Sequence, residues 1–176
     1  MHKFSCAWGL VLFSNPQKSR PETAVPVIIF FDLEFSDLQA DALMVSAGFV
    51  AEDNEAFYVE VEEAFWRSGA SQFVLDHVKP LLSNQGMPAS EVASKIIDWL
   101  NSKGPEATLI SDSDWDLRIL QNHLQRTGYQ WPDLWHWEMA PNHLPSKMHH
   151  AFDCAYQAWF LRSGHKQHHA LNDAKA

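Results

Sequence analysis

The strongest constraint on the fold is an uninterrupted apolar run, VIIFF, at residues 27–31. A continuous stretch of β-branched and aromatic residues predicts a strand buried on both faces, and therefore a central strand of its sheet. The run ends in Asp32-Leu33-Glu34-Phe35. Because side chains alternate along a strand, Asp32 and Glu34 are expected on one face and Leu33 and Phe35 on the other. Two carboxylates side by side at the end of a core strand repel each other unless something compensates their charge.

The rest of the pattern predicts an α/β domain with a mixed sheet. Apolar runs over 42–50 and 55–61, joined through Asp53-Asn54, indicate a hairpin that continues the first strand as an antiparallel meander. Farther along, helical periodicity alternates with strand-like runs, which favours parallel strands joined by helices. The expected elements are a short helix over 73–82, a helix over 90–101 capped by Ser90 and stopped by Gly104-Pro105, a strand over 107–110, a helix after Ser113 with Leu117, Leu120 and Leu124, a fifth strand or ordered loop over 131–139, and an apolar helix over 151–161.

Length and charge limit the chain to one domain and exclude several classes of function. The 176 residues suit a single domain, which we expect at 26–176 after an N-terminal extension and linker at 1–25. The first residues partly resemble a signal peptide, but no small-residue cleavage motif follows them. A net charge of −9 opposes electrostatic coating of nucleic acid or anionic membranes, and no apolar run is long enough to span a bilayer. Cys6 and Cys154 form no CxxC pattern, which is compatible with a reducing compartment.

Three groups of residues could carry chemistry: Asp32 with Glu34, Asp116 after the fourth strand, and the C-terminal His168 with Asp173. Clusters made only of carboxylates suit hard cations such as Mg²⁺ or Mn²⁺ rather than zinc. Two such ions can activate a water molecule and stabilise the leaving oxygen of a phosphodiester. A neutral histidine beside them can accept the proton of that water.

The order of these motifs resembles that of the DEDDh 3′-to-5′ exonucleases. The resemblance covers residues 27–176 and is nearest to the small bacterial and phage exoribonucleases of that superfamily. Three motifs carry it: Asp32-x-Glu34 at the end of a strand, Trp115-Asp116 opening a helix, and His168 five residues before Asp173 in HHALNDA.

The resemblance implies an RNase H-like fold, with a mixed sheet flanked by helices, and a metal-dependent exonuclease. Such an enzyme shortens single-stranded nucleic acid from its 3′ end, RNA in preference to DNA, and releases nucleoside 5′-monophosphates. The resemblance also implies two Mg²⁺ or Mn²⁺ ions as cofactors and a cytoplasmic location without membrane contact, and it allows a homodimer. Leu33 and Phe35 would contact the terminal base or ribose, and His168 would be the general base. The catalytic, metal-binding carboxylates would be Asp32, Glu34, Asp116 and Asp173.

Two features depart from the family pattern. Many relatives have Asn or His two to four residues before the second-motif Asp, whereas this chain has Asp112, Ser113 and Asp114, so either acid could add a ligand. Ser113 is itself a predicted helix cap, and Asp116 taken alone could simply interact with the helix dipole. The printed sequence ends three residues after Asp173, and so short a terminal turn needs packing or metal to hold it. The alternative function is therefore an exonuclease-fold module that binds nucleic acid or protein without turnover.

Other side chains have competing interpretations. His165, His168 and His169 could form a patch that binds a transition metal, because closely spaced imidazoles suit such ions. The aromatic side chains of WPDLWHW, at 131–137, could stack on bases, although packing in the core is the favoured interpretation. Cys154, among apolar neighbours, is expected to be buried as a small hydrophobic residue.

Overall fold

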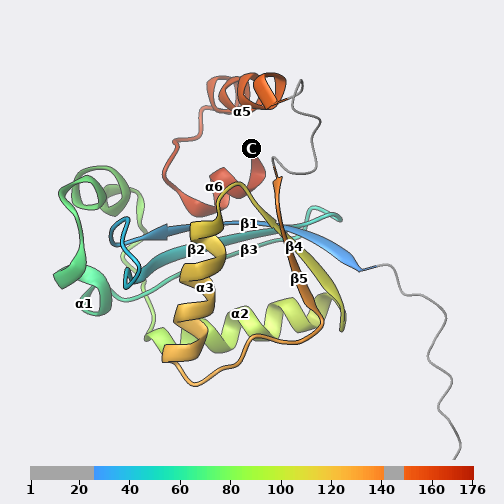
Figure 1. Ribbon diagram of the computed structural model, residues 1–176. Helices are drawn as coiled ribbons and strands as arrows, with labels where there is room; N and C mark the ends of the chain where they lie inside the picture. Colours follow the sequence, from blue (N-terminus) through green and yellow to red (C-terminus); the bar gives the residue numbers. More distant parts are fainter. Residues whose placement is uncertain (1–25, 141–148) are drawn as a thin grey trace, which may run out of the picture.

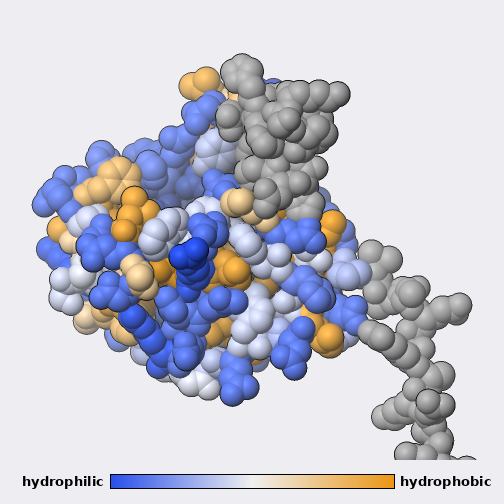
Figure 2. Space-filling model, in the orientation of Figure 1, coloured by the Kyte–Doolittle hydropathy of each residue, from blue (hydrophilic) through white to orange (hydrophobic). Residues whose placement is uncertain are grey.

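The computed structural model describes residues 26–140 and 149–176, and for 149–153 it describes only the backbone (Figure 1). The expected extension at 1–25, with its partial likeness to a signal peptide, lies outside these residues. None of the helices in the described ranges is long and apolar enough to cross a bilayer. On the face shown in Figure 2, hydrophilic side chains predominate and apolar ones form small, scattered groups.

The sheet combines antiparallel and parallel pairing, as the sequence predicts. β1 pairs antiparallel with β2, which pairs antiparallel with β3, and β4 runs parallel to both β1 and β5. Asn54 has a φ of 67° in the turn between β2 and β3, the left-handed conformation expected there. The strands are β1 (Val27–Phe35), β2 (Met44–Ala51), β3 (Ala56–Glu60), β4 (Ala107–Ser111) and β5 (Trp135–Met139), in the spatial order β3-β2-β1-β4-β5.

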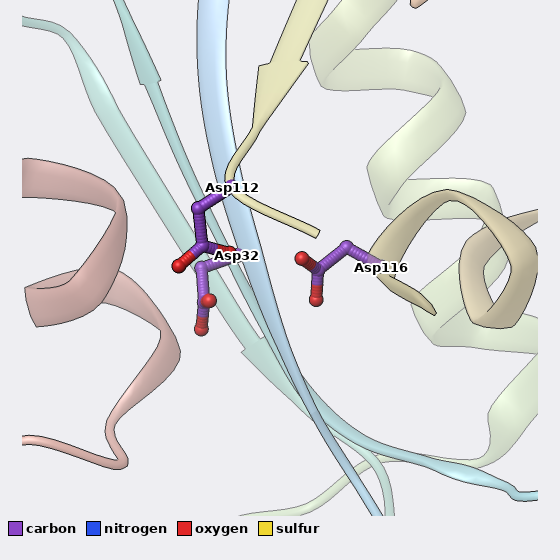
Figure 3. Close-up of side chains that lie close together, drawn as sticks. All are labelled: Asp32, Asp112 and Asp116. Atoms are coloured by element: carbon purple, nitrogen blue, oxygen red, sulfur yellow. The ribbon is translucent and has the colours of Figure 1, made fainter. Parts of the chain in front are cut away.

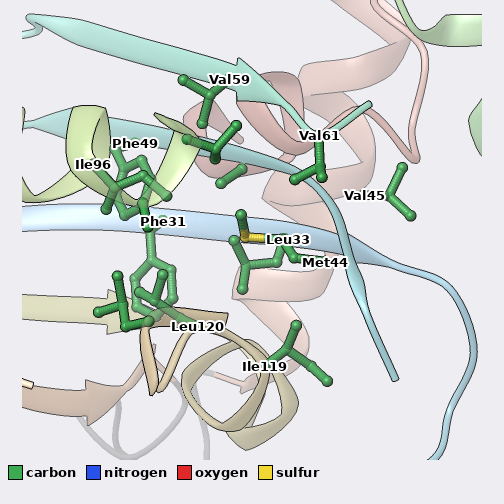
Figure 4. Close-up of a cluster of buried hydrophobic side chains, with 14 of the residues drawn as sticks. Phe31, Leu33, Met44, Val45, Phe49, Val59, Val61, Ile96, Ile119 and Leu120 are labelled. Carbon is green, nitrogen blue, oxygen red and sulfur yellow. The ribbon is translucent and has the colours of Figure 1, made fainter. Parts of the chain in front are cut away.

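Helices cover the two faces of the sheet unequally (Figure 1). α2 (Ala89–Lys103) and α3 (Asp114–Arg126) cover one face and enclose the main core. α6 (Ala170–Lys175) rests on the other face against β1 and β2, and α5 (His149–Ser163) stands beyond it. Figure 4 shows the core between the sheet and the first pair of helices, with labelled members Phe31, Leu33, Met44, Val45, Phe49, Val59, Val61, Ile96, Ile119 and Leu120.

β1 is central in the sheet, but its two faces are not equally buried. Ile29 and Phe31 are buried, whereas Ile28 is 37% exposed and Phe30 is 43% exposed. The prediction of burial on both faces is therefore wrong for the first half of this strand. The reason is that α2 and α3 cover one face, while on the other face Phe30 lines an open cavity of about 530 Å³.

The helix caps agree with the sequence at α3 and differ at α2. Ser113 caps α3, and its Oγ accepts a hydrogen bond from the Trp115 N–H at 3.1 Å. The N-cap of α2 is Pro88, without a side-chain hydrogen bond, so the prediction of Ser90 as the cap is wrong. Proline has a fixed φ and no N–H. At the start of a helix this N–H would have no intrahelical acceptor, so its absence costs no hydrogen bond. Gly104, with a φ of 138°, follows the end of α2 as predicted.

The segment between β3 and α2 consists of short helical turns. The helix predicted over 73–82 is present as a π turn followed by a 3₁₀ turn. Pro80, in the second of these turns, has no N–H to continue a regular helix. The four turns are α1 (Glu63–Trp66), η1 (Arg67–Gly69), η2 (Val74–Val78) and η3 (Lys79–Leu81).

Of two predictions about the C-terminal third, one is wrong and one is confirmed. α5 forms where an apolar helix was expected, but Cys154 is exposed and Leu161 is 86% exposed, so the prediction of a buried helix and a buried Cys154 is wrong. α5 stands away from the sheet and has no second layer to cover it among the described residues. In β5, by contrast, Trp135 is buried and Trp137 is partly buried against the core, which confirms the packing interpretation.

Candidate active site

The site begins where β4 separates from β1. The parallel pairing of these strands ends at Phe30 and Ile110, so beyond this point β4 no longer pairs with the backbone of β1. Asp116, in the first turn of α3, takes its place: Oδ1 accepts a hydrogen bond from the Leu33 N–H at 3.3 Å. Asp116 is 2% exposed, and its carboxylate turns toward Asp32 on β1 (Figure 3). The divergence of two parallel strands thus places the second motif beside the first.

A glycine on the neighbouring strand allows α6 to bring Asp173 to the same point. Gly48 on β2 is the direct antiparallel partner of Asp32. A Cβ at residue 48 would lie 2.3 Å from the Leu171 backbone nitrogen, so only glycine leaves room for the helix at this distance. Ala170, the first residue of α6, is fully buried. Close packing on the sheet therefore supplies the support that the short terminal helix was expected to need.

Five carboxylates form two overlapping groups around β1. Single carboxylate oxygens of Asp32, Asp112 and Asp116 all lie within 4.8 Å of one another, and the same holds for Asp32, Glu34 and Asp173. Asp32 belongs to both groups. In the first group, Asp32 comes from β1, Asp112 from the residue after β4, and Asp116 from α3 (Figure 3).

All the residues that the motif resemblance assigns to the site line one cavity of about 490 Å³. Their catalytic, metal-binding and substrate-binding roles stay predictions. Leu33 is 3% exposed and belongs to the core, so little of its side chain faces the cavity, whereas Phe35 is only half-buried. The residues are Asp32, Leu33, Glu34, Phe35, Asp116, His168 and Asp173.

Burial and mutual repulsion oppose ionisation of the carboxyl groups. Burial raises the pKa of Asp32 well above its usual range, and the charges of Asp116 and Glu34 raise it further. Burial first, and then the charges of Asp173 and Asp116, raise the pKa of Glu34 to about 8. Burial and the charge of Asp112 raise the pKa of Asp116 to about 8, and burial raises the pKa of Asp173 to about 6. Positive charge placed among these groups would favour their ionised forms.

The donor set fits a divalent cation. Both groups offer only carboxylate oxygens, the ligands that Mg²⁺ and Mn²⁺ prefer. The Oδ2 atom of Asp116 is buried and, within the described residues, has no hydrogen-bond partner. A buried carboxylate oxygen without a donor is destabilising, and a bound cation would satisfy it.

His168 lies at the same cavity as the carboxylates. It has a left-handed φ of 63°, and its backbone N–H donates a hydrogen bond to Oδ2 of Asp173 at 2.9 Å. Its ring meets that of Phe73 edge-on, with 5.0 Å between centroids. Partial burial, and then the charge of His77, lower the pKa of His168. The imidazole is therefore in its proton-accepting form at neutral pH.

The three C-terminal histidines do not form a joint metal patch. The ring of His165 stacks on Trp159 with 5.3 Å between centroids, and that of His169 stacks on Tyr58 with 4.6 Å. In the part of the chain that the structure describes, both groups close enough to hold a metal ion are entirely acidic. The geometry therefore separates His168, at the cavity, from its neighbour His169.

Several cavity residues have no motif that would identify them in the sequence. Tyr156 on α5 donates a hydrogen bond from its hydroxyl to Oδ1 of Asp173 at 3.4 Å. Leu38 and Phe73 line the cavity with 69% and 50% of their surfaces exposed. The sequence indicated Asp112 only as one of two possible extra ligands, the other being Asp114. Long-range packing alone assigns these four residues to the site.

The mixed sheet, with a carboxylate cluster beside its central strand, is the RNase H-like fold that the three motifs predicted. Solved structures of E. coli exonuclease I share this fold. Its complex with a dA16 oligonucleotide matches with a TM-score of 0.56 and 13% identity, over 86% of this chain and 39% of that one. A zinc-bound complex with single-stranded DNA matches with a TM-score of 0.54 and 13% identity, over 85% of this chain and 38% of that one.

This likeness shows the fold alone. The chain spans about two fifths of the length of the exonuclease I chains it matches. No protein-family model and no curated protein matches the sequence. The fold class and the resemblance to DEDDh exonucleases are thereby confirmed, and the activity is inferred from the site.

Proposed function

We propose that this protein is a metal-dependent exonuclease that shortens single-stranded nucleic acid from the 3′ end and releases nucleoside 5′-monophosphates. One observation carries the proposal: residues from three motifs far apart in the sequence line a single cavity, with their carboxylates in two groups that share Asp32. Carboxylates gathered in this way serve hydrolysis of phosphodiesters when divalent cations neutralise them.

The proposed roles follow from position and charge. Asp32, Glu34, Asp116 and Asp173 would hold two Mg²⁺ or Mn²⁺ ions, which supply positive charge that lowers the pKa of the attacking water and neutralises the leaving oxygen. His168 would accept the proton of that water, because its lowered pKa keeps the imidazole neutral. The hydrogen bond from its backbone to Asp173 ties the position of the base to that of a ligand.

The apolar wall of the cavity would hold the terminal nucleotide. Phe35 and Phe73 offer aromatic surface next to the carboxylates, and the exposed Leu38 extends that wall. Stacking of one base on an aromatic side chain contributes about 1–3 kcal/mol to binding and tolerates any base. Such a wall suits an enzyme that acts on successive nucleotides without reading their sequence.

The choice between RNA and DNA is part of the proposal. Resemblance to the small exoribonucleases favours RNA, whereas the exonuclease I structures above hold DNA oligonucleotides. The cytoplasmic location and the homodimer also stay predictions from the resemblance. We therefore propose single-stranded 3′ ends as the substrate class, with RNA preferred.

The test is a degradation assay on single-stranded RNA and DNA labelled at the 5′ end, with Mn²⁺ or with EDTA. We expect a ladder that shortens from the 3′ end only with metal, and no shortening by Asp32→Asn. Asp114→Asn is the matched control, because it removes the same charge outside both acidic groups, where Asp114 pairs with Arg118 at 2.8 Å.

One result would decide against turnover, and another against the acidic groups as its site. If the wild-type protein binds the oligonucleotide but leaves it intact with Mn²⁺, the chain is a binding module with an exonuclease fold. If Asp114→Asn loses as much activity as Asp32→Asn, the acidic groups are not the site of reaction.

A further inference from the structure

The structure places one more carboxylate in the site than the four taken from the motif resemblance. Asp112 follows the last residue of β4, and one of its oxygens lies within 4.8 Å of oxygens of both Asp32 and Asp116. Figure 3 shows the three side chains converging from a strand, a loop and a helix. Asp112 also lines both cavities beside β1, so solvent and ions can reach it.

A second observation indicates that this group of three is arranged around a ligand. Asp116 is 2% exposed, and its Oδ2 is buried without a hydrogen-bond partner among the described residues. Its other oxygen is occupied by the Leu33 N–H at 3.3 Å. The free oxygen belongs to a carboxylate that turns toward Asp32 and Asp112 (Figure 3). A cation bound at this point would satisfy the buried, unpaired acceptor and neutralise the two carboxylates beside it.

We propose that Asp112 is a fifth carboxylate ligand, which completes a cation site with Asp32 and Asp116. The chain then offers two sites of three carboxylates each, Asp32-Asp112-Asp116 and Asp32-Glu34-Asp173, joined by Asp32. Both take hard divalent cations such as Mg²⁺ or Mn²⁺, because they contain no nitrogen or sulfur donor. This assignment rests on the cation-holding role proposed above for Asp32 and Asp116.

The neighbouring acid provides a contrast. Asp114 lies two residues farther along, but its carboxylate pairs with Arg118 on the next turn of α3 at 2.8 Å. It belongs to neither acidic group. Of the two acids that the sequence left open as extra ligands, the geometry therefore selects Asp112.

The direct test is isothermal titration of the full chain with Mn²⁺, comparing wild type, Asp112→Asn and Asp114→Asn. We expect Asp112→Asn to weaken one class of Mn²⁺ site by about 10- to 100-fold, or to remove it from the stoichiometry, since even supporting groups around a metal carry effects of that size. Asp114→Asn should bind Mn²⁺ as the wild type does. Unchanged affinity and stoichiometry in Asp112→Asn would overturn the assignment.

Thermal unfolding in EDTA separates a ligand from a structural residue. Asn removes one charge from a cluster of like charges, so Asp112→Asn should unfold at the same or a higher temperature than the wild type without metal. A lower Tm in EDTA would show that Asp112 holds the loop rather than a cation, and would overturn the assignment.

The degradation assay distinguishes the two proposals. A wild-type protein that degrades no oligonucleotide but binds Mn²⁺ in a manner dependent on Asp112 refutes the exonuclease activity and leaves the metal site. An active enzyme whose Mn²⁺ binding is unchanged in Asp112→Asn refutes the assignment of Asp112 as a ligand and leaves the exonuclease activity.

Discussion

Replacing Gly48 by alanine should displace α6 and draw Asp173 away from its partners on β1. A Cβ at residue 48 would lie 2.3 Å from the Leu171 nitrogen, 2.4 Å from the Leu171 Cα and 2.5 Å from the Ala170 carbonyl carbon. Because non-bonded atoms pack at about 3.5 Å, the helix backbone has to shift by roughly 1 Å. Asp173 is on the same short helix and would move with it.

The displacement has two measurable effects. A misplacement of roughly 1 Å in a catalytic constellation can lower the rate about 100-fold. Overpacking also lowers the free energy of unfolding by about 1–3 kcal/mol. We therefore expect Gly48→Ala to fold, to degrade oligonucleotides about 100-fold more slowly, and to bind Mn²⁺ more weakly in isothermal titration.

Two other glycines provide matched controls. A Cβ at Gly69 would meet only the Ser36 Oγ, at 3.7 Å, so Gly69→Ala should change neither rate nor stability. A Cβ at Gly86 would lie 2.7 Å from Glu62 and Val61, which do not line the cavity, so Gly86→Ala should lose stability but keep Mn²⁺ affinity.

The reasoning would be refuted if Gly48→Ala kept the wild-type rate and Mn²⁺ affinity. It would also fail if Gly86→Ala lost Mn²⁺ affinity to the same extent, because loss of stability alone would then explain the effect.

Three further predictions concern pH and substrate. In EDTA the Tm should fall as the pH rises from about 4 to 8. The reason is that Glu34 and Asp116, with pKa values of about 8, keep their protons in the folded chain, whereas the unfolded chain releases them near pH 4. Mn²⁺ should remove this fall in Tm, and a Tm independent of pH in EDTA would contradict the burial of these groups. Burial lowers the pKa of His123 from 6.5 to about 4, so the unfolded chain takes up this proton first, and His123 alone should lower the free energy of unfolding by up to about 3 kcal/mol between pH 6.5 and 4, opposing the carboxyl contribution. In urea denaturation His123→Phe should lack this contribution, and an identical pH dependence of stability in both proteins would refute it. Phe73→Ala should weaken binding of a phosphorothioate oligonucleotide by about 1–3 kcal/mol in fluorescence anisotropy, and its Tm should change little because the side chain is 50% exposed. Leu134 is 45% exposed and lies outside the cavity, so Leu134→Ala should leave binding unchanged. Equal losses of binding in the two variants would exclude stacking on Phe73.

The features that the sequence predicted well depend on short stretches of chain. The alternation in Asp32-Leu33-Glu34 determines which side chains share a face, up to the irregular pairing between Glu34 and Phe35, and Ser113 caps a helix two residues before the N–H that it binds. The mixed sheet followed from the order of strand and helix patterns, because short connections limit how neighbouring elements pair. The predictions were wrong where burial of a side chain depends on another helix or strand packing over it. Phe30 and Cys154 lie in apolar stretches of sequence, yet both are exposed.

By itself, then, the sequence determined the elements, the order of the three motifs and the chemical type of the site, since periodicity, capping and donor chemistry are local properties. The motif resemblance indicated four of the five acids, but only the tertiary structure decided how they meet and added Asp112. Asp32 and Asp116 approach because β4 leaves β1 after Ile110, and Asp173 reaches them because Gly48 has no side chain to hold α6 away. Contacts between segments so far apart in the chain depend on packing distances, which no local pattern encodes.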